Sequence, residues 1–340
     1  MSDSMGITPI TEFVWDRSIR NSKRSIRLSL GDDTASEATE AAWLPVLEIA
    51  GAEEGPSLLL LAGVHGDEYE GIELIIRLFH QLAPHKLKGN LLMITAANPY
   101  SYRGGTRMSP EDGVNLARAF PGNATGTVTE RLAYELHHRF ISKADFLLDL
   151  HSGGTQYAVA TLTGYYHNPS TAFGRSCREA AEAFGAKLLW AHAEIAPGRS
   201  ISSAQSLGIP WLYTEAFGGR RIRPEDRTFF YEGTLRLLKH LGMCDNPEVG
   251  TGDDAPVISR TIYSDGNFDH SMLSETDGFF IPEVSLLDEV RQGDRIGTIY
   301  HLDGTELQQV KAETAGIVVM LLGTPVIRKQ EPVYLLAALT

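Results

Sequence analysis

An alternation of short apolar runs with amphipathic helical segments restricts the fold of this 340-residue chain more than any other feature. Several runs are apolar on both faces, which is typical of strands buried in a parallel sheet. The strand-like runs are WLPVLEIAG (43–51), PSLLLLAGV (56–64), NLLMITAAN (90–98), DFLLDLHSG (145–153), AVATLTGYY (158–166), KLLWAHA (187–193) and PWLYTEAFG (210–218). Helical patterns lie between them, over residues 69–81, 129–142, 171–184 and 224–241. The alternation predicts an α/β layer sandwich with a largely parallel sheet.

The character of the chain changes after residue 241. Residues 243–259 are polar and rich in Gly, Asp and Pro, so they are expected to form a linker. The short strand-like runs beyond them, RTIYSDG (260–266) included, predict a small all-β, barrel-like unit. We therefore expect one α/β domain over residues 1–250 and one all-β domain over 255–340. Near the N-terminus, KRSIRLSLGDD (23–33) is a candidate edge strand.

Composition excludes some partners and locations. A formal net charge of −13 argues against nucleic acid or an anionic membrane as a partner, because both require a positive surface. No apolar run approaches the roughly 18 residues of a membrane span. The N-terminal segment lacks the basic start and apolar core of a signal peptide, and only two cysteines, Cys177 and Cys244, are present. These features favour the cytoplasm.

Three of the predicted strands end in groups that can bind a metal or move a proton. His65 and Glu68 follow the first of them in GVHGDEYEG, His151 follows another in DLHSGG, and Glu215 follows a third in YTEAFGG. Open α/β sheets bind ligands beyond the carboxyl ends of their strands, so these side chains are expected to converge. Two histidines and one carboxylate form a catalytic zinc set that leaves a fourth position for water.

Each of these residues also has a structural interpretation. An H-x-x-E pair is common on a solvated helix face, and a histidine after a strand is often only a polar strand end. Glu215 has the alternative of pairing with Arg220 or Arg221. Three such groups each follow an apolar strand and lie beside glycine. Because they occur together, a metal site is as well supported as these alternatives.

Four segments, in this order, resemble the succinylglutamate desuccinylase/aspartoacylase family of zinc carboxypeptidase-like hydrolases. They are GVHGDEYEG (63–71), AANPYSYRGGTRMSPEDGVNLARAFPG (96–122), DLHSGG (149–154) and TEAFGG (214–219). The resemblance covers roughly residues 45–220, and GFFIPEVSLLDEVRQGDRIG (278–297) with AETAGIVV (312–319) is similar to the family's C-terminal domain. It implies a three-layer α/β/α zinc-carboxypeptidase-like domain.

The resemblance also implies a role for individual residues. The metal ligands would be His65, Glu68 and His151, which hold one Zn²⁺ per chain, and Glu215 would be the catalytic glutamate. Arg107 would polarise the scissile carbonyl group, and Arg118 would hold a carboxylate of the substrate. The family's asparagine before that arginine is replaced by Ala117, so Asn115 is a candidate to compensate as a substrate-binding residue.

The implied activity is hydrolysis of the amide bond of a small N-acyl amino acid, N-acetyl or N-succinyl, to a carboxylate and a free amine. Two alternatives stay open: a metallocarboxypeptidase that cleaves C-terminal residues of peptides, and a binding protein that holds metal without turnover. The C-terminal unit also resembles lipoyl- or biotinyl-type barrels, but Lys311 lies too close to a strand start for a carrier lysine. We expect this unit to be structural or a lid over the pocket. The sequence does not decide whether the chain forms a homo-oligomer.

Overall fold

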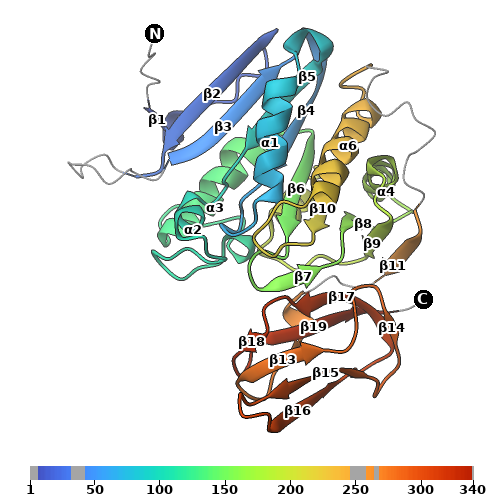
Figure 1. Ribbon diagram of the computed structural model, residues 1–340. Coiled ribbons are helices and arrows are strands. Elements are labelled where there is room, and N and C mark those ends of the chain that lie inside the picture. The colour runs from blue at the N-terminus through green and yellow to red at the C-terminus, as the bar shows by residue number, and fades with distance from the viewer. Residues whose placement is uncertain (1–6, 32–42, 246–257, 264–267, 339–340) are drawn as a thin grey trace.

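Ten strands form one large sheet in the computed structural model, which describes residues 7–31, 43–245, 258–263 and 268–338 (Figure 1). The strand order is β1-β2-β3-β5-β4-β6-β10-β8-β9-β11. Neighbouring strands are parallel except in the pairs β2–β3, β3–β5 and β10–β8. The strands are β1 (Ile7–Pro9), β2 (Ser22–Ser29), β3 (Trp43–Ala50), β4 (Glu53–Leu61), β5 (Lys88–Ile94), β6 (Phe146–Ser152), β8 (Leu162–Tyr166), β9 (Leu188–His192), β10 (Trp211–Ala216) and β11 (Arg260–Tyr263). The sheet is therefore mixed and largely parallel, as predicted.

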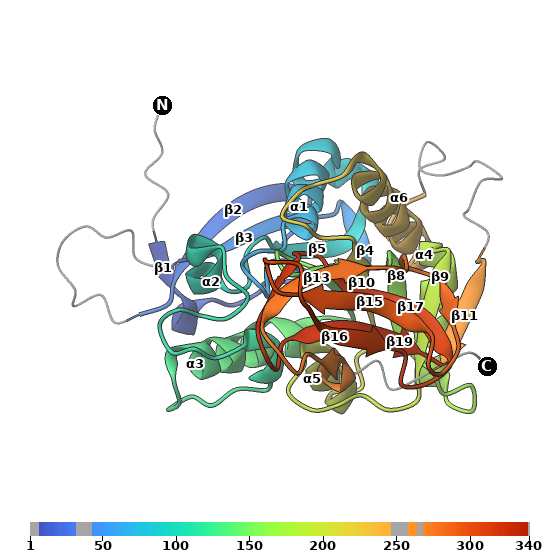
Figure 2. The same ribbon diagram turned by 60° about the horizontal axis from the view of Figure 1, so that its bottom comes forward.

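Helices cover both faces of this sheet, which gives the predicted three-layer α/β/α arrangement (Figures 1 and 2). Helices α1 (Glu70–Gln81), α4 (Ala172–Phe184) and α6 (Pro224–His240) enclose one apolar core with the strands. Helices α3 (Val128–Glu135) and α5 (Ser200–Ser206) enclose the other. Because both faces are covered, the central strands are apolar on both sides.

Local sequence explains where several helices begin. Thr127 and Glu130 form a reciprocal capping box at the start of α3, and the Thr171 hydroxyl accepts the Gly174 amide at the start of α4. Helix α6 begins at Pro224, whose fixed φ suits the first helical turn. The sequence patterns placed α1, α4 and α6 within one residue of their observed bounds. They missed two short helices, α2 (Pro99–Gly104) and α5.

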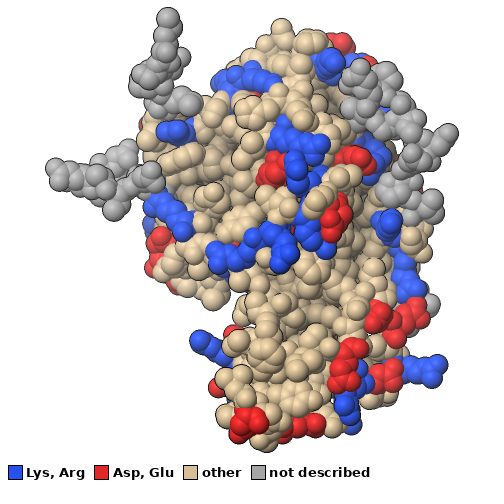
Figure 3. Space-filling view, viewed as in Figure 1, with Lys and Arg blue, Asp and Glu red and all other residues tan. Residues whose placement is uncertain are grey.

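The C-terminal part consists of two small antiparallel sheets below the large one in Figure 1. They enclose a separate apolar core that includes Phe280, Ile296 and Val333. Their strands are β12 (Met272–Leu273), β13 (Gly278–Pro282), β14 (Glu289–Val290), β15 (Arg295–Tyr300), β16 (Glu306–Lys311), β17 (Gly316–Leu322), β18 (Val326–Ile327) and β19 (Pro332–Ala337). On the face shown in Figure 3, basic side chains gather over the lower ends of α1 and α6, and acidic side chains are frequent on the C-terminal part.

Two strands belong to different sheets from those that the sequence suggested. The described part of RTIYSDG forms β11, which extends the large sheet by pairing parallel to β9 instead of joining the all-β unit. The run AVATLTGYY divides: β7 (Tyr157–Val159) pairs with β17 of the C-terminal part, and β8 stays in the large sheet. A boundary at residue 255 is thus too early, because the chain returns to the large sheet before it enters the small one. Residues 246–257 of the expected linker lie outside the described residues.

Three further expectations concern the edges and the surface. The KRSIRLSLGDD segment forms β2, which pairs with β3 along its length and with the short strand β1 only over residues 27–29. Cys177 and Cys244 are both buried free thiols. Among the described residues, no helix combines the length and the apolar character that a bilayer crossing requires.

Candidate active site

The candidate site lies where β4, β6 and β10 end side by side. His151 is on β6 and faces Glu215 across the parallel β6–β10 pair, while His65 and Glu68 lie in the loop after β4. Glycines allow this loop to turn tightly: Gly63 has a φ of 61°, and a Cβ on Gly66 would lie 1.9 Å from the Ser101 carbonyl carbon. The loop therefore folds back over the strand ends and presents its two polar side chains to His151.

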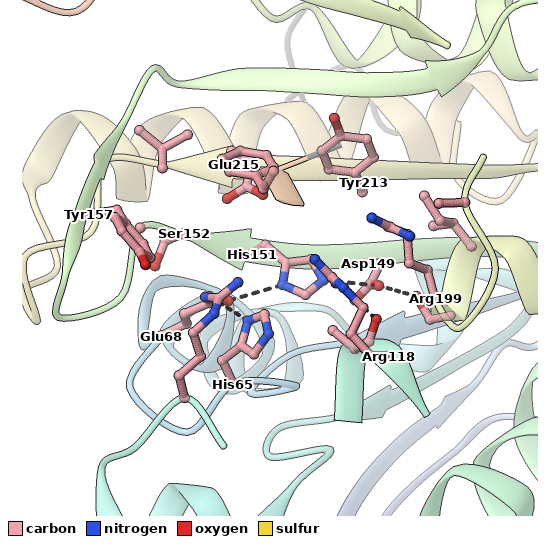
Figure 4. A pocket seen from close by; sticks show the side chains of 18 of the residues that line it. His65, Glu68, Arg118, Asp149, His151, Ser152, Tyr157, Arg199, Tyr213 and Glu215 are labelled. Atoms are coloured by element: carbon pink, nitrogen blue, oxygen red, sulfur yellow. Dashed lines mark hydrogen bonds and ion pairs between the residues drawn. The ribbon is translucent and has the colours of Figure 1, made fainter. Parts of the chain in front are cut away.

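His65, Glu68 and His151 form a compact cluster (Figure 4). One potential ligand atom from each lies within 4.8 Å of the others. The Nδ1 atom of His65 is 2.7 Å from Oε1 of Glu68, and the Nδ1 atom of His151 is 3.0 Å from Oε2 of the same carboxylate. Glu68 thus presents one oxygen to each imidazole, and the sequence-predicted trio is brought together.

The outer nitrogens of both imidazoles face oxygen acceptors. The Nε2 atom of His65 is 3.1 Å from Oδ1 of Asn115, and the Nε2 atom of His151 is 3.1 Å from Oδ2 of Asp149. An imidazole that donates its Nε2–H to such a group keeps the Nδ1 lone pair for a metal ion. Two Nδ1 atoms and a carboxylate, all directed at one point, are a donor set that fits Zn²⁺.

Ionisation of the metal-free cluster reflects its close packing. Burial opposes charge on Glu68, but His65 and His151 outweigh it and hold the pKa of its carboxyl well below the usual range. Burial alone would lower the pKa of His151, yet Asp149 and Glu68 raise it well above the usual value. The pKa of His65 is lowered, mainly by burial and also by Arg107. Without a cation, His151 therefore carries the charge that balances its carboxylate neighbours.

Glu215 lies across the cavity from this cluster (Figure 4). Its side chain is only 9% exposed, and burial, with Glu68 and Asp149 adding to it, raises its pKa to about 8. A carboxyl with a raised pKa beside a candidate metal set is suited to proton transfer. The alternative pairing of Glu215 with Arg220 is not observed. The guanidinium group of Arg220 instead lies 3.4 Å from the Tyr69 hydroxyl.

Arg107 reaches the cluster from the loop after α2. Its Nη1 atom lies 3.2 Å from Oε1 of Glu68, and its guanidinium group lies 5.9 Å from the ring centre of Tyr157. Asn115 has a different contact from the one expected. Its side-chain oxygen accepts from the Ala117 amide at 2.9 Å and also faces His65. Asn115 therefore supports the histidine, and a role in binding substrate stays a prediction.

Comparison with known proteins agrees with this geometry. Residues 54–241 match the family model of the succinylglutamate desuccinylase/aspartoacylase catalytic domain. The chain is 30% identical over 291 residues to the N-alpha-acetyl-L-2,4-diaminobutyric acid deacetylase of Halomonas elongata, covering 82% of each chain. The chain belongs to the succinylglutamate desuccinylase/aspartoacylase family. It is therefore a hydrolase of amide bonds.

Solved structures of this family share the whole architecture. A succinylglutamate desuccinylase/aspartoacylase from Rhodobacter sphaeroides is 28% identical, with a TM-score of 0.80 over 95% of this chain and 97% of its own. The product-bound ectoine utilization protein EutE (DoeB) from Ruegeria pomeroyi is 26% identical, with a TM-score of 0.82 over 94% and 96% of the two chains. The C-terminal sheets are thus part of the shared fold.

This family member has a cavity that extends from the cluster of His65, Glu68 and His151 to an arginine-rich end. Residues with polar side chains on its wall are His65, Glu68, Arg107, Arg118, Asp149, His151, Ser152, Tyr157, His192, Arg199, Ser200, Tyr213 and Glu215. Apolar side chains on its wall are Ala117, Val159, Ile195, Ala196, Ile201 and Phe268. Phe268 comes from the segment that leads into the C-terminal sheets, so that part of the chain contributes to the cavity wall. Whether the C-terminal unit acts as a lid stays a prediction.

Two polar groups of the cavity were missed by the sequence patterns or left without a role. Arg199 directly precedes α5, is 15% exposed in its side chain, and lies on the same wall as Arg118 and Ala117. His192, at the end of β9, lies 2.8 Å from the Tyr213 hydroxyl through its Nε2 atom. An arginine directly before a short Ser-rich helix was the available signal for Arg199. It was obscured because the segment has the composition of a loop.

Proposed function

We propose that this family member is a zinc-dependent deacylase that hydrolyses the amide bond of a small N-acyl amino acid, N-acetyl or N-succinyl. The products are a carboxylate and a free amino acid. The observation that carries the proposal is the convergence of His65, Glu68 and His151, with the buried Glu215 facing them. The deacetylase and desuccinylase names of its relatives support the same class of reaction.

One Zn²⁺ per chain would be held by His65, Glu68 and His151. When bound, the ion would supply a water of lowered pKa and a Lewis acid for the acyl oxygen. Asn115 and Asp149 would accept the Nε2–H of each imidazole and so leave the two Nδ1 atoms available as ligands.

Proton transfer is the role that we assign to Glu215. It would accept a proton from the attacking water and deliver that proton to the nitrogen of the departing amine. Its low exposure and raised pKa suit a group that must both accept and donate near neutral pH. Arg107, at the opposite side of the cluster, would stabilise the negative charge that develops on the acyl oxygen.

Substrate binding would fall to the arginine-rich end of the cavity. Arg118 would hold the carboxylate of the amino acid, and Arg199 is a second guanidinium group on the same wall. Because Ala117 stands where the family has an asparagine, we propose that Arg199, with Asn115 as a secondary candidate, replaces the missing hydrogen-bond donor. We also keep the cytoplasm as the proposed location, since both thiols are free.

The test is hydrolysis of a panel of N-acetyl and N-succinyl amino acids and of oligopeptides by zinc-loaded protein. We expect turnover of the free N-acyl amino acids and none of the peptides. Cleavage of peptides alone would favour a metallocarboxypeptidase, and bound metal without any turnover would favour a binding protein. His65→Ala should lose its stoichiometric zinc, whereas the exposed His80→Ala, at the end of α1, should retain it. Full zinc occupancy in His65→Ala would refute the ligand assignment.

A further inference from the structure

The cavity continues on both sides of the residues that are proposed to carry out the chemistry (Figure 4). His151 and Glu215 lie in its middle. Arg118 and Arg199 lie to their right in this view, and Tyr157 lies to their left. Under the proposed function, the arginines hold the carboxylate of the amino acid and the metal cluster holds the scissile carbonyl group. The acyl group then points away from the arginines, so the residues around Tyr157 limit which acyl group fits.

Tyr157 is on β7, a short strand that is bonded to three neighbouring segments. The Tyr157 amide donates to the Gly153 carbonyl at 3.1 Å, in the loop after β6. The Val159 amide donates to the Phe217 carbonyl at 3.1 Å, in the loop after β10. On its other edge, β7 pairs antiparallel with β17 of the C-terminal part. Hydrogen bonds on both edges of β7 therefore hold this part of the cavity wall in place.

A large aromatic ring bounds the cavity on this side. Tyr157 and Val159, two residues apart on one face of β7, both line the cavity. Gly153 lines it next to them and contributes only backbone, because a Cβ there would lie 2.2 Å from the Tyr157 carbonyl oxygen. The space beside the Tyr157 ring is thus bounded by an aromatic side chain, an isopropyl group and backbone. Such a boundary suits the methyl group of an acetyl group, whereas a longer acyl chain would meet the ring.

Arg107 is a basic side chain on this side of the cavity, and it already has a partner. Its guanidinium group lies 5.9 Å from the ring centre of Tyr157, and its Nη1 atom lies 3.2 Å from Oε1 of Glu68. Burial raises the pKa of the Tyr157 phenol, and Arg107 opposes this increase. Glu331 and Asp67 add to the increase, so two further carboxylates act on the same place. A carboxylate at the end of an acyl chain would therefore meet Glu68, Glu331 and Asp67 as like charges.

We propose that Tyr157 is a specificity-determining residue that selects a short, uncharged acyl group, so that N-acetyl rather than N-succinyl amino acids are the substrates of this site. The inference rests on the proposed function, which supplies the positions of the scissile carbonyl group and of the α-carboxylate. The methyl group of an acetyl group would lie against the ring. A butanoyl chain would collide with the ring. A succinyl chain, with the same number of carbon atoms, would in addition bring its carboxylate among like charges.

The test compares the N-acetyl, N-butanoyl and N-succinyl derivatives of the amino acid that is released fastest in the substrate panel. In wild type, kcat/KM should be highest for the acetyl derivative, by roughly tenfold or more over butanoyl, and lowest for succinyl. Tyr157→Ala should reduce the acetyl-to-butanoyl ratio roughly tenfold. The succinyl derivative should gain less, because Glu68, Glu331 and Asp67 remain. Tyr157→Phe should keep the wild-type ratios, since it keeps the ring.

Control variants show whether a change in these ratios comes from the ring of Tyr157. Tyr300→Ala removes a tyrosine at the end of β15, which does not line the cavity, and should leave the ratios unchanged. Zinc content checks that Tyr157→Ala is folded, and Tyr157→Leu takes its place if zinc is lost. The same acetyl-to-butanoyl ratio in wild type and in the variant without the ring would overturn the inference. So would a wild-type preference for the succinyl derivative.

A binding measurement separates this inference from the proposed function. If the panel gives no turnover, calorimetric affinities of zinc-loaded protein for the same three derivatives of 2,4-diaminobutyrate replace kcat/KM. Tighter binding of the acetyl derivative in wild type, lost in Tyr157→Ala, would then overturn the proposed function alone. The same relative affinities in the two proteins would overturn both.

Discussion

At one end of the cavity, His151 and Glu215 lie near the ends of strands β6 and β10, and His65 and Glu68 follow strand β4 of the same sheet; each is buried or nearly so. At the other end, Arg118 and Arg199 lie on a short 3-10 turn and on a loop, and they retain 31% and 15% exposure of their side chains. The strand ends are held by packing on both faces of the sheet, whereas the loop residues are held by a few ion pairs. A rigid end suits chemistry that requires fixed geometry, and an adaptable end suits the choice of substrate.

The largest effect on this contrast between the two ends is expected from neutralising Glu215. Glu215→Gln should keep zinc and lose turnover by roughly 10²–10⁴-fold, because it removes the proton acceptor without removing a ligand. The measurement is kcat and zinc content on the same preparation. Glu54→Gln, a highly exposed carboxylate on β4, is the matched control. Wild-type turnover in Glu215→Gln would remove this residue from the mechanism.

Replacing Asp149, which supports His151 at the rigid end, should have a smaller effect. Asp149 contacts Nε2 of His151 and also accepts a short hydrogen bond from the Ser200 hydroxyl. Asp149→Asn should weaken zinc affinity by about 10–100-fold, since the imidazole loses its anionic partner. Competition with a chelator measures this directly. Unchanged affinity would mean that packing alone orients His151.

A change at the adaptable end should alter binding more than chemistry. Arg199→Gln should raise KM roughly tenfold, with a smaller change in kcat, because a charge-assisted contact to the substrate is lost. Arg175→Gln, on the exposed surface of α4, should leave both constants unchanged. An equal fall in kcat and kcat/KM for Arg199→Gln would instead place its contact in the transition state, and the two ends would then not differ as we describe.

The last prediction concerns stability without metal, not activity. Burial of Glu215 raises its pKa from 4.5 to about 8, so the folded state binds more protons than the unfolded state between these values. The free energy of unfolding therefore loses a contribution as pH rises through this range, by at most about 3 kcal/mol between pH 6 and 8. Thermal melts with chelator should show wild type falling relative to Glu215→Gln as pH increases. Parallel curves for the two proteins would show that Glu215 is not held in a raised-pKa state.

The same contrast between the two ends explains which features of the fold and the site could be predicted from the sequence. The sheet, the helices α1, α4 and α6, and the convergence of His65, Glu68 and His151 could be predicted because each leaves a local signal, namely an apolar run, a periodic helix or a strand end beside glycine. The pairing of β11 with β9 and of β7 with β17 left no such signal, since the same run of residues can add to any open sheet edge. Arg199 was missed because an arginine in a polar loop has the same pattern whether it faces solvent or a cavity.

Diffraction at the zinc absorption edge from crystals of the zinc-loaded protein tests the central claim most directly. We predict one anomalous peak per chain, about 2.0–2.1 Å from Nδ1 of both His65 and His151 and within a similar distance of Glu68. A peak elsewhere, or contact with only one of these side chains, would contradict the account.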